Sequence, residues 1–179
     1  MKEKIVQTAS RALQNGDYPL PEVTMTQTNE SAALRDLPEL MRGLLSGESD
    51  EIALLSNAAA LIYDTVPDLN WAGFYRLAGG GLILGPFQGK PACVRIAAGR
   101  GVCGRAIETD APIVVADVRA FPDHIACDAA SASEMVVPLH RADGSLFGVL
   151  DLDSATPDRF APIAETILQT ARAIEEALG

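Results

Sequence analysis

Apolar residues near the start of the chain recur with a helical period. Ile5, Ala9 and Leu13 follow one another at intervals of four within residues 2–15, which predicts a short amphipathic helix. Residues 16–31 are rich in Pro, Thr and Asn and show no period, so we interpret them as a linker. These two segments form most of an N-terminal extension whose role the pattern does not indicate.

Three more helices are predicted from the same period. One opens at Leu37–Pro38, because proline is tolerated in a first turn, and ends near Gly47. Ser49 or Asp50 can cap the next one, which carries a strongly apolar face. The last is expected over residues 156–178. Its apolar face consists of Ile163, Ile167, Thr170, Ile174 and Leu178.

Between the helices the pattern changes to the alternation of strands. Six runs have this character: NWAGFYRL, LILGPF, VRIAA, PIVV, MVVPLH and LFGVLDLD. A glycine-rich turn and short helix, GRGVCGRAIET, precede the fourth run, and the loop RADGS joins the last two into a hairpin. Helices at both ends of consecutive strands indicate an α+β domain over residues 36–179, after an extension over 1–35. We expect an antiparallel sheet of about six strands, with helices on one face and a loop-covered pocket on the other.

Composition and charge exclude several classes of protein. The 179 residues carry a net charge of −10, and no basic stripe suited to nucleic acid is present. No apolar stretch of about 18 residues predicts a membrane span, and the first ten residues make a poor signal peptide. We therefore expect a cytoplasmic protein.

Acidic residues gather at one end of the last hairpin. Alternation places Phe147, Val149, Asp151 and Asp153 on one face of their strand. If His140 and Leu146, which flank the RADGS loop, lie opposite each other in the hairpin, Glu134 lies opposite Leu152 and near both aspartates. Three such carboxylates repel one another unless a cation lies between them or one holds a proton. They are interpreted either as a solvated strand end or as a site for an ammonium group, a metal ion or a protonated acid.

The three cysteines are an odd number, which is typical of a reducing compartment. Cys93, Cys103 and Cys127 all lie beside turns or in loops, where functional residues concentrate, although free cysteines also pack as inert core residues. Zinc is disfavoured because no CxxC pair occurs; the nearest approach is His124-x-x-Cys127. Cys103, near a helix start and among basic residues, is expected to have a lowered pKa.

Two aromatic residues, Trp71 and Tyr75, are four apart on an extended run and so face the same side. They are interpreted as core residues or as one wall of a small pocket. The two histidines, His124 and His140, lack an evident serine or aspartate partner and are left unassigned.

Taken together, the motifs resemble a known family. NWAGFY, LGPFQGKPACVRI, GRGVCG, HIACDAASASEMVVPL and GVLDLDS, in this order, are similar to those of the free methionine-(R)-sulfoxide reductases. The resemblance covers residues 36–179 and implies a GAF-type fold. It also implies reduction of the R-sulfoxide of free methionine, with electrons from thioredoxin and without a metal or organic cofactor, as a repair of oxidative damage.

Site roles follow from the resemblance position by position. Cys127 resembles the attacking cysteine, Cys93 the cysteine that resolves it into a disulfide, and Cys103 a third cysteine of less settled role. The resemblance also implies a substrate site, which consists of Trp71, Tyr75, Glu134, Asp151 and Asp153. Carboxylates there would pair with the ammonium group of a free amino acid, and one with a raised pKa would protonate the departing oxygen.

Two alternatives remain at this point. GAF folds also serve as small-ligand sensors or redox-sensing modules, although no signalling region is recognised in this chain, which favours the enzyme. The family also implies a homodimer through terminal helices, for which Ile163, Ile167 and Ile174 are candidates unless they pack on the sheet of their own chain.

Overall fold

The structure, a computed structural model, describes residues 27–123 and 128–179. Six strands form one antiparallel sheet in the order β3-β2-β1-β6-β5-β4. Their bounds are Leu69–Ala78 for β1, Gly81–Gly89 for β2, Arg95–Ala97 for β3, Ile113–Val115 for β4, Ser133–His140 for β5 and Leu146–Ser154 for β6. The predicted α+β fold with a six-stranded antiparallel sheet is confirmed.

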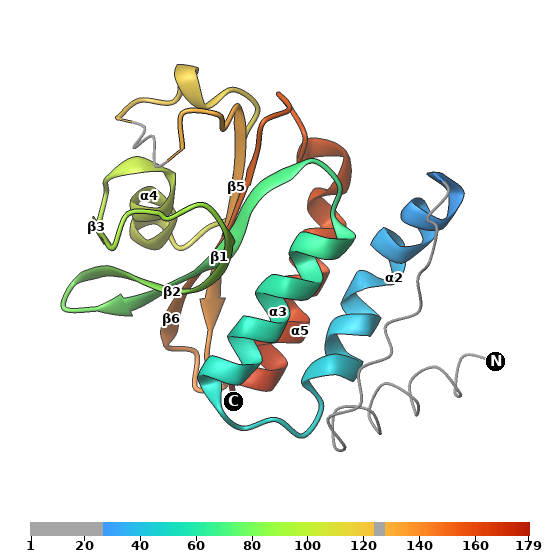
Figure 1. Ribbon diagram of the computed structural model, residues 1–179. Coiled ribbons are helices and arrows are strands. Elements are labelled where there is room, and N and C mark those ends of the chain that lie inside the picture. The colour runs from blue at the N-terminus through green and yellow to red at the C-terminus, as the bar shows by residue number, and fades with distance from the viewer. Residues whose placement is uncertain (1–26, 124–127) are drawn as a thin grey trace.

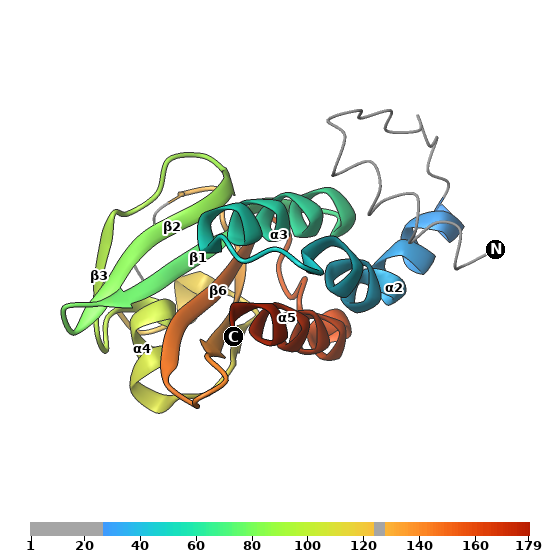
Figure 2. The ribbon, with the colours of Figure 1, turned by 90° about the horizontal axis from the view of Figure 1, so that it is seen from below.

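Three helices lie on one side of this sheet. Helices α3 (Glu51–Thr65) and α5 (Ala164–Leu178) pack against the strands, and α2 (Gln27–Leu45) packs on α3 and α5 as an outer layer, as Figures 1 and 2 show. The short helix α4 (Gly101–Thr109) lies on the opposite face, against β3, β5 and β6, together with the long connections. Two short 3₁₀ turns, Val118–Ala120 and Ala161–Ile163, complete the described elements.

The buried side chains form two clusters, one on each side of the sheet. The larger cluster joins α2, α3 and α5 to the strands and includes Phe74, Leu150 and Leu152. The smaller cluster lies under α4 and includes Tyr75 and Val149. Alternating residues of β1 and β6 therefore serve both clusters, which fixes which side chains can reach the α4 face.

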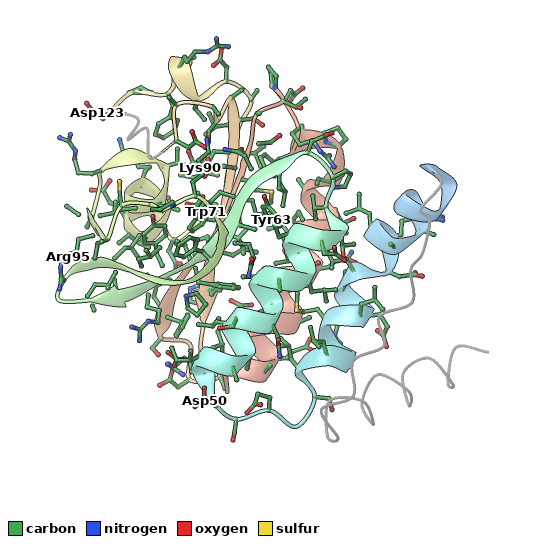
Figure 3. All side chains as sticks on the ribbon, in the orientation of Figure 1. Asp50, Tyr63, Trp71, Lys90, Arg95 and Asp123 are labelled. Carbon is green, nitrogen blue, oxygen red and sulfur yellow. The ribbon has the colours of Figure 1, made fainter. Side chains whose placement is uncertain are left out.

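The start of α3 agrees with the sequence. Asp50 is its N-cap, in an extended conformation, and its side chain accepts a hydrogen bond from the backbone N–H of Ala53 at 2.9 Å. This bond satisfies one of the free N–H groups of the first turn. Asp50 lies at the end of α3 nearest the loop from α2 (Figure 3).

Two predicted helix starts are wrong. Helix α2 begins at Gln27, ten residues before the expected start, and contains Pro38 in its interior. Its partly buried Leu34 continues the buried face that includes Leu37 and Met41, so packing against the core outweighs the hydrogen bond that proline removes. The predicted helix over residues 2–15 lies outside the described residues.

The last helix begins at Ala164 rather than at residue 156, after a 3₁₀ turn that contains Pro162. Its expected apolar face is buried as predicted. Ile163, Ile167 and Ile174 lie in the core between α5 and the sheet of their own chain, so they are not available to a partner helix. Among the described residues, no helix is long and apolar enough to cross a membrane.

Candidate functional site

A pocket opens on the α4 face of the sheet, and most of the predicted site residues line it. Strands β1, β5 and β6 and the first turn of α4 supply its base, and the segments after β2 and before β5 supply its rim. Six of the predicted residues line it: Trp71, Tyr75, Cys103, Glu134, Asp151 and Asp153. Sequence reasoning missed other lining residues: Lys90, Arg100, Asp128 and Ser131.

The carboxylates converge through the pairing of β5 with β6. Glu134 lies directly opposite Asp153, one residue from the predicted partner Leu152, and Asp151 lies opposite Val136. Glu134 and Asp151 are buried, each 6% exposed. The predicted acidic cluster is therefore a real feature of the fold, and it faces the pocket rather than solvent.

A β-bulge in β6 explains the one-residue difference in register. His140 pairs with Leu146 as predicted, but Leu139 pairs with Gly148, so Phe147 is an extra residue on β6. The prediction that Phe147 shares a face with Val149 is therefore wrong. Phe147 is buried in the helix-side cluster, whereas Val149 and the aspartates beyond it face α4.

Burial and mutual repulsion raise the pKa values of two of these acids. The pKa of Asp151 is raised well above its usual value by burial, and further by the nearby Asp153 and Glu134. The pKa of Glu134 is raised well above its usual value by burial and by Asp153. A charged carboxylate is unfavourable in such surroundings, so the site favours protonated acids or a bound cation.

Cys103 lies in the first turn of α4, at the base of the pocket. Its Sγ is 4.0 Å from Oε1 of Glu134 and its side chain is buried. The expected low pKa is wrong: burial raises the pKa of the Cys103 thiol well above its usual value, and the charges of Asp151 and Glu134 raise it further. The basic neighbours do not compensate, since Arg105 instead forms an ion pair with Glu108 on the exposed side of α4.

An aromatic stack forms one wall. The ring of Trp71 stacks on Tyr75 at a centroid distance of 5.8 Å and on Phe87 of β2 at 5.4 Å. Trp71 Nε1 donates a hydrogen bond to the backbone oxygen of Lys90 at 3.1 Å, which fixes the indole, and both residues are labelled in Figure 3. Gly73 leaves room for the stack, because a Cβ there would lie 2.4 Å from Cβ of Phe87. Both earlier interpretations of the pair apply, since Trp71 and Tyr75 are buried and also line the pocket.

Of the two remaining cysteines, the structure describes Cys93 alone, in the rim segment after β2. Cys93 is half-buried and packs against the α4-side cluster, one residue after the lining residue Ala92. Cys127 lies outside the described residues. The described residue that follows it, Asp128, forms an ion pair with Lys90 at 3.0 Å, which ties the segment before β5 to the segment that carries Cys93.

Asn70, at the start of β1, also holds the segment before β5 in place. Its Nδ2 donates to Oγ of Ser131 at 3.0 Å and to Oδ2 of Asp128 at 3.3 Å. The backbone N–H of Ala130 also donates to Asp128, at 3.0 Å. The pKa of the Asp128 carboxyl is lowered by this backbone bond and by Lys90, so Asp128 is a charged anchor, unlike the acids inside the pocket.

The fold and this pocket define a class of protein. Residues 45–174 match the family model described as GAF domain, so the chain belongs to the GAF family. It is 52% identical to Protein YtsP of Bacillus subtilis, over 78% of this chain and 86% of that protein. It is 48% identical to the free methionine-R-sulfoxide reductase of Escherichia coli, over 74% of this chain and 79% of that protein.

A solved structure of another free methionine-R-sulfoxide reductase has the same fold. The X-ray structure of free methionine-R-sulfoxide reductase from Neisseria meningitidis, in complex with its substrate, matches with a TM-score of 0.80 and 38% identity. The match covers 87% of this chain and 94% of that one. Within the GAF class, this chain belongs to the free methionine-R-sulfoxide reductase family.

Proposed function

We propose that this protein reduces free L-methionine (R)-S-oxide to methionine by thiol chemistry. The observation that carries the proposal is the convergence of the buried acids Glu134 and Asp151 with the aromatic wall of Trp71 and Tyr75 in one pocket, whose lining also includes Asp128, the residue after Cys127. A thiol, paired acids and an aromatic surface are the three features that a thiol-dependent reductase of a small zwitterionic sulfoxide requires. Family membership supports the same activity.

The acids account for the preference for the free amino acid. Its ammonium group carries the positive charge that Asp151, Asp153 and Glu134 need for neutralisation, whereas the nitrogen of a methionine residue within a chain is an uncharged amide. A cation between these carboxylates replaces their mutual repulsion with charge-assisted hydrogen bonds. The aromatic wall then faces the sulfur end of the substrate, since sulfur and methyl groups pack well against aromatic rings.

An acid with a raised pKa can supply the proton that the reaction consumes. The sulfoxide oxygen is a poor leaving group until it is protonated, and a carboxylic acid that is still protonated near neutral pH can donate that proton. Glu134 and Asp151 both have pKa values raised by burial. One acid can therefore act as the proton donor while the remaining carboxylates hold the ammonium group.

Three thiols complete the proposed cycle. The thiolate of Cys127 attacks the sulfoxide sulfur, the S–O bond of the substrate breaks, and the products are methionine and the sulfenic acid of Cys127. Cys93 then condenses with this sulfenic acid, which gives a disulfide and water. Asp128 beside Cys127 lines the pocket, and its ion pair with Lys90 holds that segment near Cys93. Cys103, with a raised pKa, is less suited to attack and serves as a reserve resolving thiol.

Recycling requires an external dithiol. Two electrons pass from reduced thioredoxin to the Cys127–Cys93 disulfide, and both thiols are regenerated. The proposed cycle uses no organic cofactor and no metal ion. A thioredoxin reductase then draws on NADPH, so turnover consumes one NADPH for each sulfoxide reduced.

This stoichiometry gives the test. Purified protein is mixed with thioredoxin, thioredoxin reductase and NADPH, and the separated R and S epimers of free methionine sulfoxide are supplied in turn. NADPH oxidation with the R epimer, and none with the S epimer, is the expected result. Absence of NADPH oxidation with either epimer, while a control methionine sulfoxide reductase is active in the same mixture, would refute the proposal.

A further inference from the structure

The base of the pocket has the composition of a metal site. Sγ of Cys103 and one carboxylate oxygen each of Glu134 and Asp151 all lie within 4.8 Å of one another, and all three side chains are buried. Glu134 and Asp151 come from neighbouring strands, and Cys103 approaches from the first turn of α4 on the same face. Among the described residues, this is the one group of three or more such side chains close enough to hold a single ion.

A second observation points to a ligand at the same place. Oδ1 of Asp151 is completely buried and has no hydrogen-bond partner in the structure, although the side chain lines the pocket. A buried carboxylate oxygen without a partner is costly, because it loses its hydration and gains nothing in exchange. A cation in the space between Asp151, Glu134 and Cys103 would satisfy this oxygen.

We propose that Cys103, Glu134 and Asp151 form a binding site for a thiophilic divalent cation of the Zn²⁺ type. Zn²⁺ accepts thiolate and carboxylate ligands together, with bonds of roughly 2.3 and 2.1 Å, whereas Mg²⁺ and Ca²⁺ prefer oxygen alone. Tetrahedral Zn²⁺ needs ligand atoms about 3.4–3.6 Å apart, so atoms that lie within 4.8 Å of one another need to approach by about 1.2–1.4 Å at most. Three protein ligands leave the fourth position to water from the open side of the pocket.

Binding balances both charge and protons. The Cys103 thiol and any carboxyl group that holds a proton release their protons to solvent as Zn²⁺ enters. Two positive charges then neutralise most of the three negative ones. No electron is transferred, and the sulfur is held as a thiolate bonded to the metal.

The site overlaps the carboxylates that hold the substrate ammonium group in the proposed function. Zn²⁺ and free methionine sulfoxide therefore exclude each other, and Zn²⁺ is a competitive inhibitor of the reductase. This consequence rests on the proposed function, whereas the metal site itself does not. Inhibition would be reversed by a chelator, because no covalent change occurs.

Cobalt provides a direct test of the ligand set. Co²⁺ is added to the reduced full-length protein, and the absorption spectrum is recorded for the thiolate-to-cobalt charge-transfer band and for the intensified visible bands of a tetrahedral ion. We expect one Co²⁺ per chain with a thiolate band, and displacement of the Co²⁺ by Zn²⁺ but not by Mg²⁺. Absence of a thiolate band, or displacement by Mg²⁺, would overturn the proposal.

Variants identify the ligands. Cys103→Ala abolishes the thiolate band, and Asp151→Asn weakens Zn²⁺ binding by at least about tenfold, since even the outer partners of metal ligands contribute that much. Cys93→Ser is the matched thiol control and Asp128→Asn the matched carboxylate control; both should keep the band and the affinity. A band that survives in Cys103→Ala but is lost in Cys93→Ser or Cys127→Ser would place the metal elsewhere and overturn the assignment.

Zn²⁺ affinity is measured separately by competition with a chromophoric chelator, with circular dichroism to confirm that each variant is folded. Inhibition is then measured in the thioredoxin-coupled assay. Metal binding without any reductase activity would leave the site standing and refute the proposed function. Reductase activity without metal binding would support the proposed function and refute the metal site.

Discussion

Glu134 on β5 lies directly opposite Asp153 on β6, near the end of both strands, and like charges in such a pair are destabilising. Asp151 lies two residues before Asp153, on the same side of β6. Like Glu134, it is buried. Three carboxyl groups on two neighbouring strands are therefore held in an arrangement that is unfavourable for the fold. Such strain is typical of a binding site whose ligand supplies the missing positive charge.

The first prediction is that Asp151→Asn stabilises the protein and weakens its function. The pKa of Asp151 is raised in the folded state, so the folded protein binds more protons than the unfolded chain, and its stability falls as the pH rises from about 3.8 through the folded pKa. Asparagine cannot ionise, so the variant does not lose stability through this group as the pH rises. We expect a gain on the order of 1–3 kcal/mol near pH 8, or roughly 2–4 °C in Tm for each kcal/mol, and a smaller gain near pH 5.

Calorimetry of Asp151→Asn at both pH values tests this prediction, and Asp128→Asn is the control with the opposite sign. The pKa of Asp128 is lowered by the N–H of Ala130 and by Lys90, so its stabilising effect is present above its unfolded pKa and is lost as the pH falls. Asp128→Asn should therefore lower Tm near pH 8. A lower Tm for Asp151→Asn near pH 8 would contradict the raised pKa of Asp151.

The second prediction concerns the form of the substrate. N-acetyl methionine sulfoxide lacks the ammonium charge, so it cannot neutralise the carboxylates of the pocket. We expect its kcat/KM to be lower by about tenfold to a hundredfold, the loss for one or two charge-assisted hydrogen bonds. The methyl ester of methionine sulfoxide, which keeps the ammonium group, is the matched control. Equal kcat/KM values for the free and acetylated forms would remove the role assigned to the acids.

The third prediction is a pH-dependent contribution of His140 to stability. Nδ1 of His140 lies 3.1 Å from Glu175 of α5, and Nε2 lies 2.9 Å from Asp110 at the end of α4. Partial burial lowers the pKa of His140, but the hydrogen bonds with Glu175 and Asp110 outweigh it, and the pKa is raised. Its stabilisation is therefore fully present below the unfolded pKa of about 6.5 and is lost as the pH rises through the folded value.

His140→Gln should accordingly lower Tm more at about pH 6 than at about pH 9, where the imidazole is neutral. Comparison with the unmodified protein at each pH removes the separate pH effect of the buried acids. A difference in Tm that is the same at both pH values would show that His140 acts through packing alone.

The sequence predicts the elements that depend on local chemistry and on alternation. An N-cap at Ser49 or Asp50, the six strands and the clustering of Glu134 with Asp151 and Asp153 follow from residue type and spacing alone. The structure confirms them and shows that Asp50 is the cap. The motifs also predict the family, which the relatives confirm.

Features that depend on tertiary packing were not predictable in the same way. Helix α2 continues through Pro38 because Leu34 and Leu37 are held against the core, which local propensity does not indicate. The bulge at Phe147 changes the face of one residue, and the adjacent Gly148 was the signal in the sequence that could have marked it. The low pKa expected for Cys103 fails for the same reason, because burial against two acids outweighs its position at a helix start.

The fourth prediction assigns the three thiols. Cys127→Ser should form no methionine even in a single turnover, because the attacking sulfur is absent. Cys93→Ser should complete the first turnover but recycle slowly with thioredoxin, and Cys103→Ser should show an intermediate defect. Quench-flow measurement of methionine per chain distinguishes them. A full burst from Cys127→Ser, with none from Cys103→Ser, would reverse the assignment.

The central claim is that the thiols of this chain reduce the R-sulfoxide of free methionine. The most direct measurement mixes the reduced protein with one epimer of free methionine sulfoxide, without thioredoxin or any other reductant, and counts the methionine formed. The proposed chemistry predicts about one methionine per chain from the R epimer, the loss of two thiols, and no methionine from the S epimer. No methionine from the R epimer, or equal amounts from both epimers, would contradict it.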